Sequence, residues 1–195
     1  NLKLEITIVT DAETYKKFKP LGFINYKLIE PELGNKRNGE QWNQLERCYA
    51  YDHSPYDTTI LMDCDYFCYT DNLLTYTNID NDFLIHDKIH DLTGKDVYNF
   101  RQDSIIPMLW ATVIVFKKTH RAKRIFDMVK YIKQHYQYFC KLYRISFPNF
   151  RNDYAFSMAM NQVNGNTQQT FLPGKIPTLP ALAKILEVKD TGIVF

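Results

Sequence analysis

The sequence has no apolar run of about 18 residues, the length that a membrane-spanning helix needs. It also shows no secretory signal peptide, no internal repeat and no low-complexity tract. The formal net charge is only +2, without the basic excess of dedicated nucleic-acid-binding domains. These absences argue against a membrane segment in this chain and against nucleic acid as a partner, and we expect a cytoplasmic protein.

Cysteine is scarce and irregularly placed. The four cysteines are Cys48, Cys64, Cys68 and Cys140, and no two of them form a Cys-x-x-Cys pair. Zinc knuckles and disulfide-rich secreted domains depend on closely spaced cysteines. The sequence therefore predicts neither framework, and a reducing compartment is the expected environment.

Aromatic residues, in contrast, are abundant, with 14 Tyr, 13 Phe and 2 Trp. The hydrophobic content of 45% and the charged content of 24% are those of an ordinary globular protein. A chain of 195 residues fits a single domain over 1–195, large enough to bury roughly 70% of its unfolded surface. Because aromatic side chains both fill cores and stack on sugars or bases, their abundance gives weak support to a carbohydrate or nucleotide ligand.

Segments with strand and helix patterns alternate along the chain. Periodicity and turn-forming residues predict strands over 2–10, 22–29, 58–63 and 109–116, and helices over 12–19 and 40–51, from Thr119 and from Asn152. Residues 73–96 are predicted to be irregular. Alternating strands and helices favour an α/β fold with a mixed, mainly parallel sheet flanked by helices.

The two helices of the second half have the clearest patterns. The helix from Thr119 places apolar residues from Ile125 to Phe139 on one face. The helix from Asn152, a good N-cap residue, has Asp153 in its first turn and ends before Gly165, which suits a helix C-terminus. Each helix thus has an apolar side to pack on the sheet.

The most informative stretch is residues 58–65, Thr-Thr-Ile-Leu-Met-Asp-Cys-Asp. An apolar run stops there at two aspartates, and strand alternation predicts that Asp63 and Asp65 point to the same side. Hard carboxylate oxygens suit Mn²⁺ or Mg²⁺, ions that substrate phosphates often help to coordinate. The alternative is a strand end that carries two solvated acids.

A second pair, Asp80 and Asp82, follows a polar, turn-prone segment and is interpreted as a solvated loop.

With these elements the chain resembles a GT-A type glycosyltransferase, close to the glycogenin-like and galactosyltransferase-like enzymes. The resemblance lies in Arg47 and in residues 51–57, 60–65, 110–117 and 151–155, and spans roughly residues 5–165. It implies a Rossmann-like GT-A domain that transfers a sugar from a nucleotide-diphosphate sugar, with UDP-sugars favoured, to an acceptor hydroxyl. The sequence does not indicate the acceptor or the oligomeric state.

The resemblance also implies roles for individual residues. In that family the Asp-x-Asp binds Mn²⁺ or Mg²⁺, so Asp65 is expected on the metal, with Asp63 on the metal through water or on the ribose. Arg47, 16 positions before Asp63, is expected at the diphosphate or sugar. Asp153 is the candidate general base for the acceptor hydroxyl, or a residue that positions sugar or acceptor. Its alternative role is that of an ordinary acid in a helix first turn.

Two further candidates have equally ordinary alternatives. Asp11 ends a predicted strand beside the expected site and is a nucleotide-binding candidate, although turn acids are common there. Trp110 either stacks on a sugar or fills the core, and we favour the core.

His86 and His90 have the spacing of a helical zinc site but lack its glutamate, so we interpret them as exposed histidines.

The chain departs from the family pattern at two places. The first strand of the family normally precedes a segment like residues 2–10, so we expect the chain to be N-terminally incomplete and to lack that strand. The glycogenin-like branch often supplies a histidine near the C-terminus as a third metal ligand, whereas this chain has none after His135. Another group or water would then complete the metal shell.

Two rival functions remain at the sequence level. A phosphohydrolase of the haloacid-dehalogenase type also places Asp-x-Asp after an apolar strand, but it expects Thr or Val where this chain has Phe67. The other rival is a non-catalytic domain that binds nucleotide sugar or carbohydrate. The first rival is weak, and the second gains if the missing first strand is absent from the whole protein.

Overall fold

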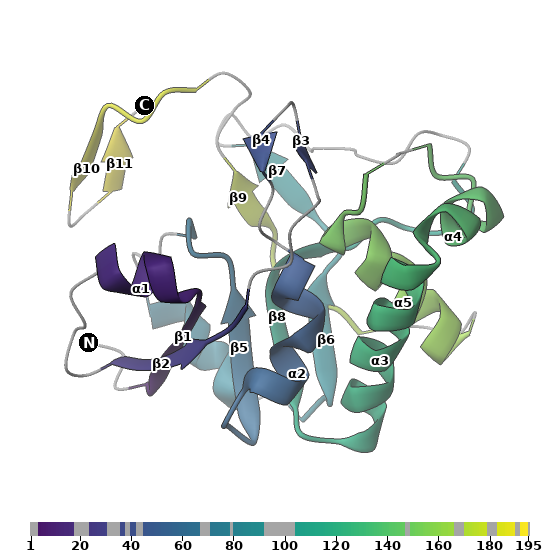
Figure 1. Ribbon diagram of the computed structural model, residues 1–195, viewed down its shortest axis with the longest axis horizontal. Coiled ribbons are helices and arrows are strands. Elements are labelled where there is room, and N and C mark those ends of the chain that lie inside the picture. The colour runs from purple at the N-terminus through teal and green to yellow at the C-terminus, as the bar shows by residue number, and fades with distance from the viewer. Residues whose placement is uncertain are drawn as a thin grey trace.

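The computed structural model describes residues 4–17, 24–30, 36–37, 40–41, 45–66, 71–78, 80–91, 104–146, 149–165, 170–178, 183–189 and 192–194 (Figure 1). The helices are α1 (Ala12–Lys17), η1 (Leu45–Tyr49), α2 (Ala50–His53), η2 (Asp71–Asn78), α3 (His120–Gln134), α4 (Tyr136–Leu142) and α5 (Asn152–Asn164), where η marks a 3₁₀ helix. None of the helices in these ranges is long and apolar enough to cross a bilayer.

The strands are short and belong to several small sheets. They are β1 (Ile6–Thr10), β2 (Ile24–Leu28), β3 (Lys36–Arg37), β4 (Glu40–Gln41), β5 (Thr58–Met62), β6 (Phe83–His86), β7 (Ile89–Asp91), β8 (Trp110–Lys117), β9 (Ile176–Thr178), β10 (Glu187–Lys189) and β11 (Gly192–Val194). Pairs β1–β2 and β7–β9 are parallel, whereas β3–β4 and β10–β11 are antiparallel. The protein is therefore mixed α/β, as predicted.

The central sheet has the order β5–β8–β6, and β8 runs antiparallel to both neighbours. The prediction of a mainly parallel sheet is thus wrong for the described strands. It assumed that strands separated by helices all run the same way. That holds for β5 and β6, which are both antiparallel to β8 and hence parallel to each other, but β8 enters between them in the reverse direction. A Rossmann-like GT-A fold is not confirmed.

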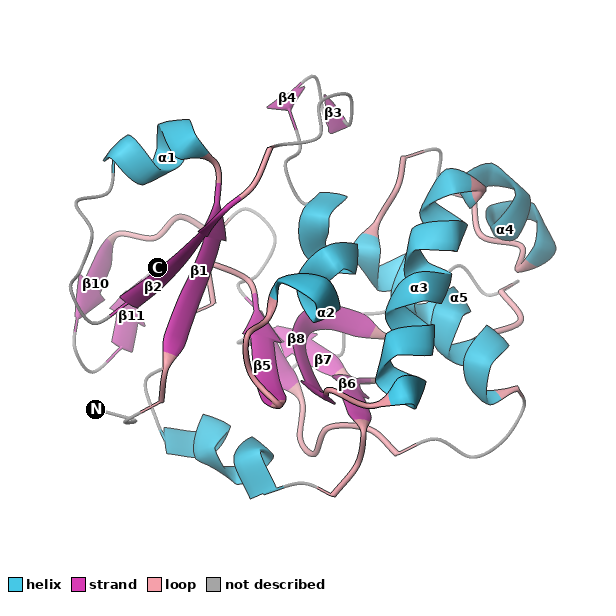
Figure 2. Cartoon of the chain, turned by 60° about the horizontal axis from the view of Figure 1, so that its bottom comes forward, coloured by secondary structure: helices cyan, strands magenta, loops and turns pink. Residues whose placement is uncertain are grey.

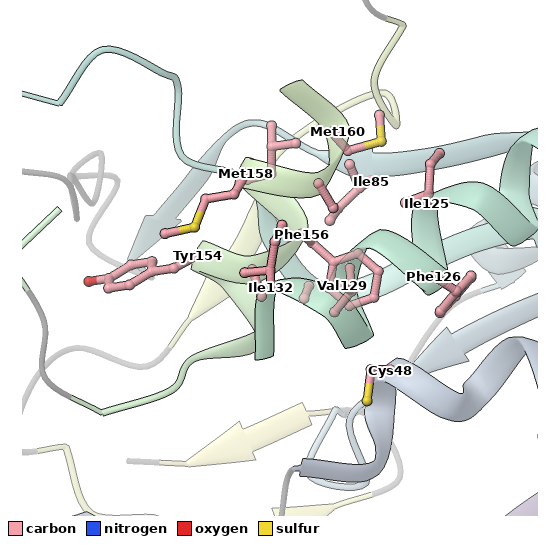
Figure 3. Close-up of a cluster of buried hydrophobic side chains, with 14 of the residues drawn as sticks. Cys48, Ile85, Ile125, Phe126, Val129, Ile132, Tyr154, Phe156, Met158 and Met160 are labelled. Carbon is pink, nitrogen blue, oxygen red and sulfur yellow. The ribbon is translucent and has the colours of Figure 1, made fainter. Parts of the chain in front are cut away.

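Helices α2, α3 and α5 lie on one face of the central sheet, in Figure 1 and in the rotated view of Figure 2. Strand alternation sends Phe83 and Phe116 to that face, where their rings contact Phe126 of α3 at 5.8 and 4.9 Å between centroids. Phe156 of α5 completes the ring cluster at 5.5 Å from Phe126. Figure 3 shows the interdigitation of α3 and α5 side chains. This packing fixes the position of α5, whose N-terminus lines the site described below.

The opposite face of the sheet has a smaller core. Leu84, Val113 and Val115, whose strand neighbours point to the helices, cluster there with Leu172. Both faces of β6 and of most of β8 are therefore buried, which explains why their sequences are almost continuously apolar instead of alternating.

Several predicted elements have different bounds or a different type. Where a helix was predicted over 40–51, the described residues form β4, η1 and α2, and residues 42–44 lie outside the described part. The segment 73–96, predicted to be irregular, contains most of η2 together with β6 and β7, and its residues 79 and 92–96 are not described. Strand β6 was missed because it is only four residues long and buried on both sides, so it has no alternating pattern. The helix from Thr119 is confirmed, with the Thr119 side chain as N-cap, but α3 ends at Gln134 and Phe139 lies on the separate α4.

The start of β8 is irregular. Ile85 pairs with Ile114, yet the next residue, His86, pairs with Trp110, so residues 111–113 of β8 have no partner on β6. Such bulges bend a strand and redirect its side chains, and they are common beside functional sites. Here the bulge lies where β5 ends and α5 begins.

Candidate functional site

A pocket of about 150 Å³ opens at this end of the central sheet. Its lining comes from η1, from the residue after β5, from the bulged start of β8 and from the N-terminus of α5, namely Arg47, Asp63, Trp110, Ala111, Thr112, Arg151, Asn152 and Asp153. Four residues predicted from the sequence, Arg47, Asp63, Trp110 and Asp153, thus come together although more than a hundred positions separate the first from the last.

Asp63 follows the last residue of β5 and begins a turn. Its backbone N–H donates to the Thr112 carbonyl at 3.1 Å, and its own carbonyl accepts from the Tyr66 N–H at 3.1 Å. The strand therefore ends before Asp65, which is exposed on the turn. Strand alternation, on which the prediction for Asp63 and Asp65 was based, ends at Met62 and does not extend to these two residues.

Arg47 projects from η1 to Asp63, and its Nη2 donates to Asp63 Oδ1. Only 9% of the Arg47 side chain and 19% of the Asp63 side chain are exposed. Burial lowers the pKa of the Arg47 guanidinium, and the nearby carboxylates of Asp153 and Asp65 act against that decrease. The buried Nη1 of Arg47 has no hydrogen-bond partner within the described residues. A buried donor of this kind is costly, and an anionic ligand in the pocket would satisfy it.

Asp153, in the first turn of α5, connects the helix to β8. Its Oδ1 accepts from the Ala111 N–H at 2.9 Å, and its Oδ2 accepts from Arg151 at 3.1 Å. One turn later, Ser157 Oγ accepts from the Leu109 N–H at 2.7 Å. These bonds satisfy backbone N–H groups at the irregular start of β8, so Asp153 has a structural role in addition to bordering the pocket.

Trp110 lies between Leu109 and Ala111, whose backbone N–H groups donate to Ser157 and Asp153. Leu109 and Ala111 are each 1% exposed, whereas Trp110 is only half-buried and lines the pocket. The preference for a pure core role is therefore not supported, because Trp110 borders the pocket.

Asp11 is not among the pocket-lining residues. It lies immediately before α1, where its Oδ1 accepts from the Thr14 N–H at 2.8 Å and its Oδ2 accepts from the Thr14 hydroxyl at 2.6 Å. These hydrogen bonds lower the pKa of the carboxyl group, the side-chain bond from Thr14 most of all. The helix cap accounts for this aspartate.

Sequence reasoning missed Arg151 as a site residue, although it belongs to one of the stretches that carry the resemblance. Arg151 is the N-cap residue of α5 and lies over the Tyr154 ring at 5.1 Å. The helix was predicted to start with Asn152 as its cap, one residue later, and a single arginine before a helix gives no pattern from which its position could be read.

His86 corrects the prediction of exposed histidines. It is 3% exposed at the end of β6, and its Nδ1 has no hydrogen-bond partner in the described part of the chain. Burial, acting against Asp87 and a bond to the Gly174 backbone, lowers the pKa of His86 to about 4. A histidine that follows three buried residues, Phe83 to Ile85, continues the buried strand instead of facing water.

The carboxylates of Asp63 and Asp65, in the turn after β5, are the candidate ligands for a divalent metal. Within the described ranges no three or more His, Cys, Asp or Glu side chains cluster as a metal site would require. Mn²⁺ and Mg²⁺ are bound in many enzymes by one or two carboxylates together with water and substrate phosphates. Carboxylate oxygens are the donor type that such an ion prefers, and two carboxylates are too few for a closed structural metal site.

Compared with known proteins, the chain matches no family, no curated protein and no solved structure.

Proposed function

We propose that this protein is a metal-dependent glycosyltransferase that moves a sugar from a nucleotide-diphosphate donor to an acceptor hydroxyl. The observation that carries the proposal is the pocket in which Asp63, the buried Arg47 and Asp153 meet at one end of the central sheet. Binding a diphosphate and an adjacent sugar requires a cation with an unused donor, a carboxylate suited to a metal and a second carboxylate.

The donor diphosphate would lie between Arg47 and the Asp63–Asp65 turn. The guanidinium Nη1 would donate to a phosphate oxygen, and Arg47 would stabilise the negative charge that develops on the leaving nucleoside diphosphate. A bound Mn²⁺ or Mg²⁺ would neutralise further charge on the same phosphates. UDP-sugars remain the favoured donors.

The sugar and the acceptor would lie toward α5 and β8. The Asp153 carboxylate already accepts bonds from Ala111 and Arg151, which suits orienting a sugar or acceptor hydroxyl better than removing its proton. The open part of Trp110 offers an apolar face to a pyranose ring. We therefore propose Asp153 primarily as a positioning residue for the transfer.

Isothermal titration calorimetry of UDP- and GDP-sugars, with and without Mn²⁺, tests this function. We expect binding that requires Mn²⁺ in the wild type and is lost in Asp65→Ala, because the exposed turn carboxylate would be a metal ligand. Asp80→Ala is the matched control, since Asp80 belongs to the other Asp-x-Asp and is exposed outside the pocket. This variant is expected to bind like the wild type.

The outcomes separate the rival functions. Metal-dependent binding followed by release of the nucleoside diphosphate supports a transferase. Metal-dependent binding without turnover for any acceptor tested supports a nucleotide-sugar-binding domain. If the folded protein binds none of the donors under any condition, the proposed function is wrong.

A further inference from the structure

We propose, building on the function proposed above, that Arg47 competes with the divalent metal for Asp63, so that metal and diphosphate each bind more tightly when the other is present. Arg47 would thus be the residue that couples the two ligands. This role goes beyond binding the diphosphate, because the charge of Arg47 would weaken the binding of the metal when no diphosphate is present.

The first observation is the buried Arg47–Asp63 pair itself. With exposed fractions of 9% and 19%, both side chains are largely removed from water. A charge in such a place needs a partner, and separating the pair leaves each charge poorly compensated. A metal that takes Asp63 therefore has to replace the guanidinium as the partner of the carboxylate.

The second observation is the surroundings of the guanidinium. A metal at Asp63 would place a second cation next to Arg47, and the two like charges would repel each other strongly in this poorly hydrated site. A diphosphate in the pocket removes the conflict, since its oxygens provide a new partner for the guanidinium and for its unsatisfied Nη1.

The third observation concerns the second carboxylate of the pocket. Asp153 lines the same pocket as Arg47 and Asp63, and an arginine guanidinium stays protonated in proteins. A negative charge therefore remains beside Arg47 when its bond to Asp63 is exchanged for one to phosphate. If metal binding favours diphosphate binding in this way, the reverse must hold by the same factor.

Substitution of Arg47 is the first test. Arg47→Met removes the competing charge and keeps a long side chain. Without nucleotide, the variant is expected to bind Mn²⁺ about tenfold more tightly than the wild type, a factor typical of coupling between sites. The binding is measured from the electron paramagnetic resonance signal of the free aqua ion. In the presence of Mn²⁺, UDP should bind more weakly to this variant. Arg121→Met is the control, because Arg121 pairs with Asn164 outside the pocket.

Substitution of Asp63 gives the mirror-image test. Asp63→Asn keeps the shape of the side chain but no longer neutralises Arg47. With a chelator present, UDP is expected to bind severalfold more tightly to this variant than to the wild type, because Arg47 is free to pair with phosphate. The control is Asp127→Asn, which removes a carboxylate paired with Lys123 and Lys130 outside the pocket.

The results distinguish this inference from the proposed function. If wild-type protein binds Mn²⁺ and UDP together but neither variant shows its gain in affinity, the competition is overturned and the proposed site stands. If the wild type binds neither ligand, both proposals fail. Should Arg47→Met not fold, the Asp63→Asn comparison decides alone.

Discussion

Asp153 accepts two hydrogen bonds of different kinds, and two substitutions at this position distinguish them. The bond from the Ala111 N–H is structural, whereas the bond from Arg151 orders the pocket lining. Asp153→Ala leaves the Ala111 N–H without its acceptor and should lower the free energy of unfolding by about 1–2 kcal/mol. Asp153→Asn keeps an oxygen for Ala111 and should cost less. Urea unfolding of both variants measures the difference.

The same pair of variants separates structure from function at this position. If Asp153 positions the sugar or acceptor, the rate of transfer should fall in Asp153→Asn although the protein stays folded. Equal stability of the two variants would contradict the assignment of the Ala111 bond.

Helices α3 and α5 are joined to the sheet by a cluster of rings centred on Phe126. Its ring contacts Phe83, Phe116 and Phe156 with centroid distances of 5.8, 4.9 and 5.5 Å, and it is fully buried. Phe126→Ala should lower the free energy of unfolding by about 3–5 kcal/mol, because the cavity touches both helices and the sheet. Urea unfolding is the measurement.

A matched control lies further along the chain. Tyr138 is an aromatic residue on α4 with 65% of its surface exposed. Tyr138→Ala should change the free energy of unfolding by at most about 0.5 kcal/mol. A similar decrease in the free energy of unfolding in both variants would mean that the ring cluster does not hold the helices on the sheet.

Elements with a long amphipathic pattern could be predicted from the sequence, and short buried ones could not. The α3 helix shows helical periodicity and a threonine cap, so its start at Thr119 was correct. Strand β6 and the direction of β8 depend on which strands become neighbours, which a single sequence does not encode locally. At the site, the strand-end position of Asp63 was predictable, whereas Arg151 was not, because its place results from how α5 packs.

For the protein as a whole, buried His86 predicts a loss of stability in acid. Its pKa is about 4 in the folded state, against an ordinary value of 6.5. The unfolded state therefore binds the proton more readily between these values. The free energy of unfolding should fall as the pH decreases from about 6.5 to 4, with a contribution from His86 of about 3 kcal/mol.

Substitution isolates this contribution from that of the carboxylates. In His86→Leu the decrease between pH 7 and pH 4, followed by urea unfolding at each pH, should be smaller by about that amount. His120→Gln is the control, since His120 is exposed at the start of α3. A pH profile of His86→Leu that parallels the wild type would show that His86 does not resist protonation.

The placement of β8 between β5 and β6 also has a consequence for synthesis of the chain. Both outer strands of the central sheet precede β8 in the sequence, yet each finds its partner in it. On the ribosome, β5 and β6 must wait until residues up to 117 have emerged, which takes a few seconds at about 5–20 residues per second. During that interval two apolar strands expose unpaired edges, the features that promote association between nascent chains. The order of strands thus delays the closure of the central sheet, and with it the assembly of the pocket, until β8 has been synthesised.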